Sequence, residues 1–126
     1  MIDRYLSEVE ASLRAIRPLI AHETIAVERP EHVPLAYLKG RITFIDGSQL
    51  VLSEIVSPSV KAYRFHYMDR RHQLICRWDN APHHRRLKTF PFHLHTPEAI
   101  IESDAVHLPH VLHIIQDRLM RHLGTA

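Results

Sequence analysis

The hydrophobic positions at the two ends of the chain repeat with the period of an α-helix. Near the N-terminus, a spacing of three, four and three residues places one set on a single helical face, at Leu6, Val9, Leu13 and Ile16. Pro18 discourages continuation of that helix. Near the C-terminus, helical spacing returns at Leu108, Val111, Leu112, Ile115 and Leu119. The pattern predicts one amphipathic helix at each end.

Between these ends the period changes to two, which is typical of strands with one buried face. Five segments are rich in β-branched and aromatic residues, namely 24–28, 35–45, 49–56, 60–68 and 73–79. Turn-forming residues separate two pairs of these segments, at 46–48 and at 69–72. Residues 90–95 could add a short strand, although Pro91 favours an edge position. These segments predict an antiparallel meander.

Together the elements predict an α+β fold. We expect residues 1–126 to form a single domain, in which an N-terminal and a C-terminal helix pack on an antiparallel β-meander of about five to six strands. A chain of 126 residues with 45% hydrophobic residues has the length and composition of one globular core. The helices would cover one face of the sheet, which leaves the other face or an edge for a functional site.

Cysteine content and hydropathy restrict the location of the protein. Cys76 is the single cysteine, which suits a reducing compartment and excludes an intramolecular disulfide. The N-terminus has neither the basic start nor the apolar stretch of a signal peptide, and no segment approaches the roughly 20 apolar residues of a membrane span. We therefore expect a cytoplasmic protein with no membrane partner.

Positive charge is concentrated in one part of the chain. The formal net charge is +2, but residues 61–88 contain eight Lys or Arg and only two Asp. Clustered cations attract phosphate groups, and an acidic protein partner is the alternative. The charge distribution alone does not decide between these two kinds of partner.

The 12 histidines differ in the surroundings that the pattern predicts for them. Seven lie at turns, at element ends or beside the apolar stripe of the last helix, where solvent exposure is the simpler interpretation: His22, His32, His72, His107, His110, His113 and His122. The other five lie on or after predicted strands, four of them in the dense stretch from Trp78 to His95. On a strand, His93 and His95 share one face, and so do Arg64 and His66.

This stretch contains the groups that RNA cleavage requires. A base must remove the 2′-hydroxyl proton, an acid must protonate the leaving 5′-oxygen, and histidine suits both tasks near neutral pH. The candidate catalytic residues are His66, Asp79, His83, His84, His93 and His95. Arginine can contact two phosphate oxygens at once. The candidate phosphate-binding residues are Arg64, Arg77, Arg85, Arg86 and Lys88. Trp78 alternates with Cys76 and is predicted to be core.

Alternatives to this hypothesis remain open. The same histidines could bind a transition metal, with Asp79 or Glu54 as a further ligand, but no dedicated metal-binding spacing is present and the adjacent arginines oppose a cation. We therefore expect no metal and no other cofactor. Asp79 could merely build a turn. Glu54 follows two leucines at alternate positions, so it either ends the buried stripe or faces the site. The protein could also act without catalysis, by binding a polyanion or a protein.

Three segments carry a resemblance to a known family. The runs Tyr63–Tyr67, Arg77–His84 and Phe90–His95 resemble the TumE family of toxins from toxin–antitoxin modules, and the likeness extends from about Leu38 to about Ile115. It implies a small cytoplasmic growth-inhibiting protein whose neighbouring gene encodes an antitoxin, often a DNA-binding one. It does not define the reaction. Trp78 stands where tyrosine is commoner, and Phe92 where histidine often occurs, which removes one potential metal ligand.

The resemblance therefore implies a toxin, and the histidines and arginines make a metal-independent endoribonuclease acting on RNA the main hypothesis. A metal-dependent hydrolase or nuclease built on His83, His84, His93 and His95 is the second hypothesis, and a non-enzymatic binding protein is the third. The sequence does not settle whether the chain is an enzyme. A homodimer is compatible with it.

Overall fold

The computed structural model describes residues 1–123, so the last three residues of the expected domain lie outside the described part. Two helices, α1 (Ile2–Ile16) and α2 (Leu108–Leu123), flank the strands, and a 3₁₀ helix, η1 (Arg17–Leu19), follows α1. The strands are β1 (Ile20–Glu28), β2 (Ala36–Phe44), β3 (Gln49–Val56), β4 (Lys61–Met68), β5 (Leu74–Asp79), β6 (His93–His95) and β7 (Ile100–Glu102).

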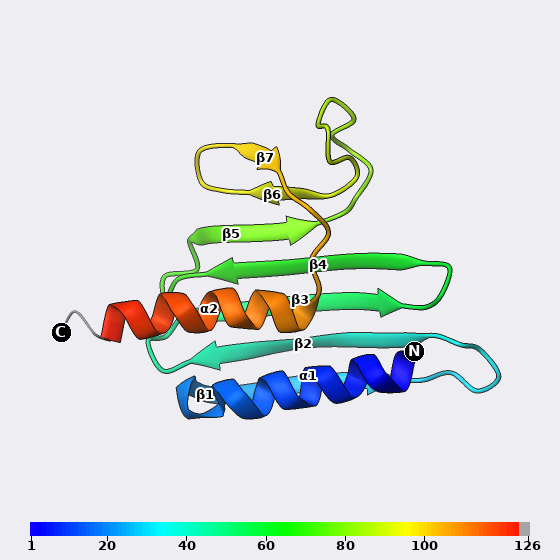
Figure 1. Ribbon diagram of the computed structural model, residues 1–126. Coiled ribbons are helices and arrows are strands. Elements are labelled where there is room, and N and C mark those ends of the chain that lie inside the picture. The colour runs from blue at the N-terminus through cyan, green and yellow to red at the C-terminus, as the bar shows by residue number, and fades with distance from the viewer. Residues whose placement is uncertain (124–126) are drawn as a thin grey trace.

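The strands form one antiparallel sheet in which their order in space equals their order in the sequence. Figure 1 shows both helices lying across the same face of this sheet, with the long connection between β5 and β6 rising past the level of β6 and β7. The α+β class and the meander are confirmed. The sheet has seven strands rather than five to six. β6 is shorter than the predicted segment 90–95, and the three-residue β7 was not predicted.

Alternation along the strands separates a core face from an open face. The core face packs against the helices through residues that include Leu38, Leu52, Phe65 and Trp78, all of which are buried. The helices contribute the apolar stripes predicted for them, with Val9 and Ile16 from α1 and Val111 and Ile115 from α2 among the buried residues. Trp78 is therefore a core residue, as predicted.

The open face carries the polar residues that alternate with this core. Two rows of cross-strand neighbours run from β2 to β6. The first row consists of Lys39, Ser53, Arg64, Asp79 and His93, and the second consists of Arg41, Val51, His66, Arg77 and His95. Each row begins at a cation on β2 and ends at a histidine on β6. The sheet thus brings residues that are more than 50 positions apart in the sequence onto one surface.

Candidate functional site

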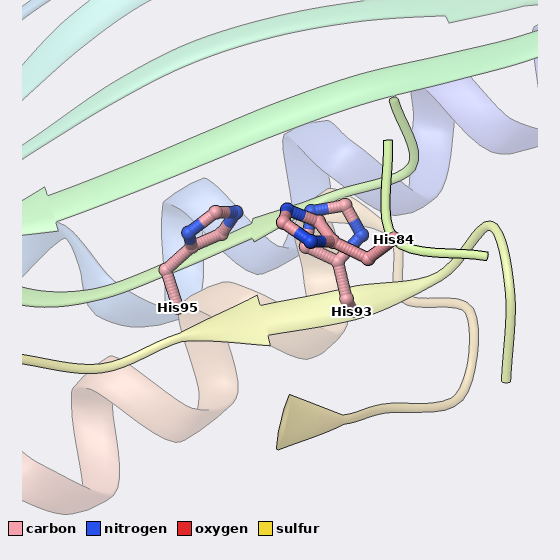
Figure 2. Close-up of side chains that lie close together, drawn as sticks. All are labelled: His84, His93 and His95. Carbon is pink, nitrogen blue, oxygen red and sulfur yellow. The ribbon is translucent and has the colours of Figure 1, made fainter. Parts of the chain in front are cut away.

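Three histidines and one aspartate meet at the β5–β6 end of the open face. In the antiparallel pair β5–β6, Asp79 lies opposite His93 and Arg77 lies opposite His95, so all four side chains share one face. His84 comes from the connection between these two strands. Figure 2 shows its ring next to the ring of His93, with His95 further along the same strand. We call Asp79, His84, His93 and His95 the histidine cluster.

Asp79 connects the two strand histidines. Its Oδ1 lies 2.7 Å from Nε2 of His93, and its Oδ2 lies 3.3 Å from Nε2 of His95. Nδ1 of His93 is 2.9 Å from the carbonyl oxygen of Pro91, which can only accept a hydrogen bond, so Nδ1 carries the proton. His93 is 2% exposed. The ring of His93 is therefore fixed at both nitrogens and sealed from solvent.

The rings of His84 and His95 are the more accessible members of the histidine cluster. The centroid of the His84 ring is 4.8 Å from that of His93 and 5.8 Å from that of His95. Neither ring is fully buried, whereas His93 is. Nη2 of Arg77 approaches the ring nitrogens of His95 at 3.3 and 3.5 Å. Substrate could reach His84 and His95 but not the ring nitrogens of His93.

The surroundings of these histidines disfavour their protonated forms. Desolvation, together with the positive charge of Arg77 and the neighbouring His93 and His84, lowers the pKa of His95, although Asp79 opposes the change. Desolvation and the charges of nearby histidines and Arg86 likewise lower the pKa of His84. His84 and His95 therefore give up their protons more readily than an ordinary histidine, and in the neutral form each can accept a proton or bind a metal.

A second pair on the open face has unsatisfied hydrogen-bonding atoms. His66 on β4 lies opposite Arg77 on β5. Among the described residues, Nδ1 of His66 and Nε of Arg77 are buried and lack a hydrogen-bond partner. Nε of Arg77 is 3.4 Å from Oδ2 of Asp79, within ion-pair range only. Buried polar atoms normally have partners, so these two atoms are an unusual feature of the open face beside the histidine cluster.

The predicted site residues fall into two groups. His84, His93, His95 and Asp79 converge, and Arg64, His66 and Arg77 lie beside them on the open face. The others lie on the exposed β5–β6 connection: His83, Arg85, Arg86 and Lys88. His83 lines the same hollow as Arg64 and Asp79, and Arg85 lies over the ring of Phe90 at 6.0 Å. Within residues 1–123, the side chain of Lys88 forms no hydrogen bond or ion pair with the histidine cluster.

Two open questions from the sequence have structural answers. The Oδ1 atom of Asp79 accepts a hydrogen bond from the amide of Ala81 at 3.1 Å, so Asp79 builds the turn and contacts the histidines as well. Glu54 lies on the core face, where Tyr5 donates a hydrogen bond to its carboxylate at 2.6 to 2.7 Å. Glu54 therefore lies within the buried stripe, which continues to Val56, and it does not belong to the histidine cluster.

The open face also contains cations that the sequence analysis did not single out. Lys39 and Arg41 line a hollow of about 580 Å³ together with Arg64 and His66. The alternation within 35–45 predicts that Lys39 and Arg41 point to the face of the sheet away from the buried Leu38 and Ile42. Their proximity to β4 depends on strand register, which the sequence does not encode locally. Ser53 connects this hollow with one of about 610 Å³ that reaches Arg77 and Asp79.

Comparisons with known proteins identify the family. No helix within residues 1–123 is both long and apolar enough to cross a membrane. No curated protein and no solved structure matches the chain. Residues 9–119 match the family described as Toxin TumE, and this range includes all seven strands and the whole histidine cluster. The resemblance seen in the sequence is thus confirmed over most of the chain, and the protein belongs to the TumE toxin family.

Proposed function

We propose that this TumE-family toxin is an endoribonuclease that cleaves RNA at the histidine cluster. The family makes the protein the toxin of a toxin–antitoxin module, with a cognate antitoxin as its partner. The observation that carries the proposal is the convergence of His84, His93 and His95, whose ring nitrogens lie within 4.8 Å of one another, beside Arg77. RNA as the substrate, a DNA-binding antitoxin and a homodimer remain predictions.

The proposed reaction needs one base and one acid. A neutral imidazole removes the proton of the 2′-hydroxyl, and the 2′-oxygen attacks phosphorus. The bond from phosphorus to the 5′-oxygen breaks, and a protonated imidazole gives its proton to that oxygen. The products are a 2′,3′-cyclic phosphate and a free 5′-hydroxyl. We assign these two tasks to His84 and His95, because they are the accessible rings of the histidine cluster.

The surroundings of His84 and His95 favour one ring as the base and the other as the acid. A proton on His84 disfavours a proton on His95, because their charges repel each other. This repulsion favours the state in which one ring is neutral and the other is charged over the state in which both are charged. A singly protonated pair supplies a base and an acid at the same time. His93 and Asp79 act as positioning residues, since both nitrogens of His93 are engaged.

The cations of the site supply the remaining requirement, which is stabilisation of negative charge on the transferring phosphoryl group. Arg77 lies in contact with both His95 and Asp79. Its buried Nε lacks a hydrogen-bond partner, as does Nδ1 of the neighbouring His66. A small shift of the Arg77 side chain toward the open face would let its Nε donate a hydrogen bond to a phosphate oxygen. Arg64, the cross-strand neighbour of Asp79 on β4, adds a second positive charge to the open face.

The decisive experiment is a cleavage assay with purified protein. We expect the wild type to cut single-stranded RNA without added metal and to leave 2′,3′-cyclic phosphate ends. His95→Ala should reduce the rate by about 10²- to 10⁴-fold. His113→Ala is a matched control, because His113 is an exposed histidine on α2. Intact RNA with and without chelator, combined with loss of toxicity in His95→Ala, would exclude nuclease activity and favour non-enzymatic binding.

One observation favours a second candidate, a metal-dependent nuclease. His84, His93 and His95 have the spacing of a metal-binding group. The hydrogen bond from Nδ1 of His93 to the Pro91 carbonyl is of the kind that orients a metal-bound histidine. To bind zinc, Nε2 of His93 would have to exchange its contact with Asp79 for the metal. The three imidazoles would then leave a fourth position open, where zinc would activate a water molecule. Elemental analysis and the effect of chelator on cleavage distinguish this candidate from metal-free catalysis.

A further inference from the structure

We propose that the open face of the sheet is a binding groove for single-stranded RNA, which extends from the histidine cluster to Lys39 and Arg41 on β2. This proposal rests on the proposed function for the identity of the ligand. It adds a binding surface far from the reacting groups, which neither the family description nor the candidate site includes. The groove consists of the two cross-strand rows that start at Lys39 and Arg41.

The groove is continuous across the sheet. Three hollows, of about 580, 540 and 610 Å³, all contact Ser53 at the centre of the open face. The first and third share Arg64 as well, and the first and second share Lys39. The rows from β2 to β6 cross four strand spacings, which amounts to about 19 Å. A ligand in this groove could therefore contact β2 and the histidine cluster simultaneously.

The charges along the groove suit a chain of phosphates. Lys39, Arg41, Arg64 and Arg77 follow one another across β2, β4 and β5. Within residues 1–123, Lys39 and Arg64 form no ion pair, and Arg41 donates only to the neutral Gln49. The acidic residues on this face are Glu28 at the far end, Asp79, which is engaged by His93 and His95, and Glu102 on β7, which lies opposite His93. Cations without acidic partners on β2 and β4 can follow a phosphate backbone.

An aromatic ring at one end of the groove, and a second on the β5–β6 connection, favour unpaired bases. Tyr37 on β2 is 41% exposed and lines the hollow that contains Lys39. Phe90, on the β5–β6 connection, is 38% exposed with Arg85 above its ring. Exposed rings beside a positively charged sheet stack on splayed bases, which double-stranded RNA does not offer. Cleavage also requires the 2′-oxygen to swing into line with the leaving oxygen, which an unpaired strand permits.

An acidic segment of the antitoxin could bind the same cations, but it would not need exposed aromatic rings. RNA uses both of these features, so we assign the groove to RNA. Binding of an acidic protein segment is therefore an outcome that the experiment must detect.

The test measures binding without cleavage. A fluorescent 12-nucleotide RNA, methylated at every 2′-oxygen, cannot be cut by the proposed reaction, and its anisotropy reports affinity. We expect Lys39→Ala/Arg41→Ala to weaken binding by about tenfold or more. Loss of two phosphate contacts should also reduce the slope of log K against log salt by about 1.4. The control is Arg14→Ala/Arg121→Ala, which removes two exposed cations from α1 and α2 on the opposite side.

Wild-type affinity in the Lys39→Ala/Arg41→Ala variant, or an equal loss in the control, would overturn the proposal. So would equal affinity for a duplex of the same length. If binding of a polyglutamate peptide requires Lys39 and Arg41 while binding of RNA does not, the groove belongs to a protein partner. Because this RNA cannot be cut, the binding result can be interpreted even if the protein turns out not to be a nuclease. Conversely, cleavage that is unaffected by the double substitution would refute the groove alone.

Discussion

Asp79 and His93 form a buried pair in which Oδ1 of the carboxylate lies 2.7 Å from Nε2 of the imidazole. They are direct cross-strand neighbours on β5 and β6, and both are less than a tenth exposed. The same carboxylate contacts His95 through its other oxygen. This one residue thus fixes the orientation of both strand histidines, and it does so at the point where β5 ends and the connection to His84 begins.

Asp79→Asn tests this positioning role. The amide keeps the size of the carboxylate and one oxygen, but it loses the negative charge and cannot accept from both histidines. We expect RNA cleavage to fall by about 10- to 100-fold, comparable with the loss of other residues that orient a functional histidine. Circular dichroism should show an unchanged fold. Arg77→Lys serves as a comparison, because it keeps the charge beside Asp79 while removing the planar guanidinium.

His95 should titrate below the ordinary range of histidine, and His84 should be one of the causes. Burial is the largest cause of its lowered pKa, followed by Arg77, so His84→Ala should raise the pKa of His95 only part of the way. A two-dimensional NMR titration of the imidazole resonances measures this directly. His113→Ala should leave the pKa of His95 unchanged. An unaltered pKa of His95 in His84→Ala would contradict the singly protonated pair.

The same lowered pKa values have a consequence for stability. A histidine with a depressed pKa in the folded state binds fewer protons there than in the unfolded chain, so stability rises with pH in this range. The contribution of His95 is therefore complete above the unfolded pKa of about 6.5 and is lost as the pH falls below it. Urea titrations at pH 5 and pH 7.5 should show a smaller difference in unfolding free energy for His95→Ala than for the wild type.

Periodicity predicted most of the fold because each long element buries one regular face. The helical stripe at Val9, Leu13 and Ile16 and the alternation within 49–56 both match the buried residues. The shortest strands escaped prediction for a physical reason. β7 has three residues, and a period of two cannot be recognised over so short a length. β1 starts at Ile20 rather than at residue 24, because its first residues pair with the end of β2.

The location of the site could be predicted, but its composition could not. Alternation alone placed His93 and His95 on one face, and the structure agrees. Which neighbours they meet depends on strand register and on the path of the β5–β6 connection. These brought His84 to the histidine cluster and left Lys88 exposed. Register also aligned Lys39 with Arg64 across β3, a relationship between residues that no local spacing encodes.

Gly40→Ala should destabilise the protein strongly. Gly40 pairs with Ile25 on the neighbouring strand, and an added Cβ would lie 2.0 Å from the backbone oxygen of Thr24. Because backbone atoms cannot move aside as a flexible side chain can, β1 and β2 must separate. We expect a loss of at least about 2 kcal/mol in unfolding free energy, measured by urea denaturation. Ser53→Ala on adjacent β3 changes an exposed side chain and should have little effect.

Glu54→Gln tests the buried carboxyl group on the core face. Burial raises the pKa of Glu54 to about 7, and Tyr5 donates its hydroxyl proton to the side chain. In the folded state the carboxyl group therefore binds a proton more tightly than in the unfolded chain, where the ordinary value is 4.5. The sign of the dependence follows: this contribution to stability is complete below pH 4.5 and is lost as the pH rises toward 7.

Glutamine imitates the protonated carboxyl group but does not titrate. Relative to the wild type, Glu54→Gln should therefore become more stable as the pH rises from 4.5 to 8, by an amount on the order of 3 kcal/mol. Urea denaturation at several pH values measures this difference. Tyr5→Phe removes the hydrogen-bond donor and should raise the pKa of Glu54 further, because that bond favours the charged form. A difference that does not vary with pH would show that Glu54 is ionised in the folded protein throughout this range.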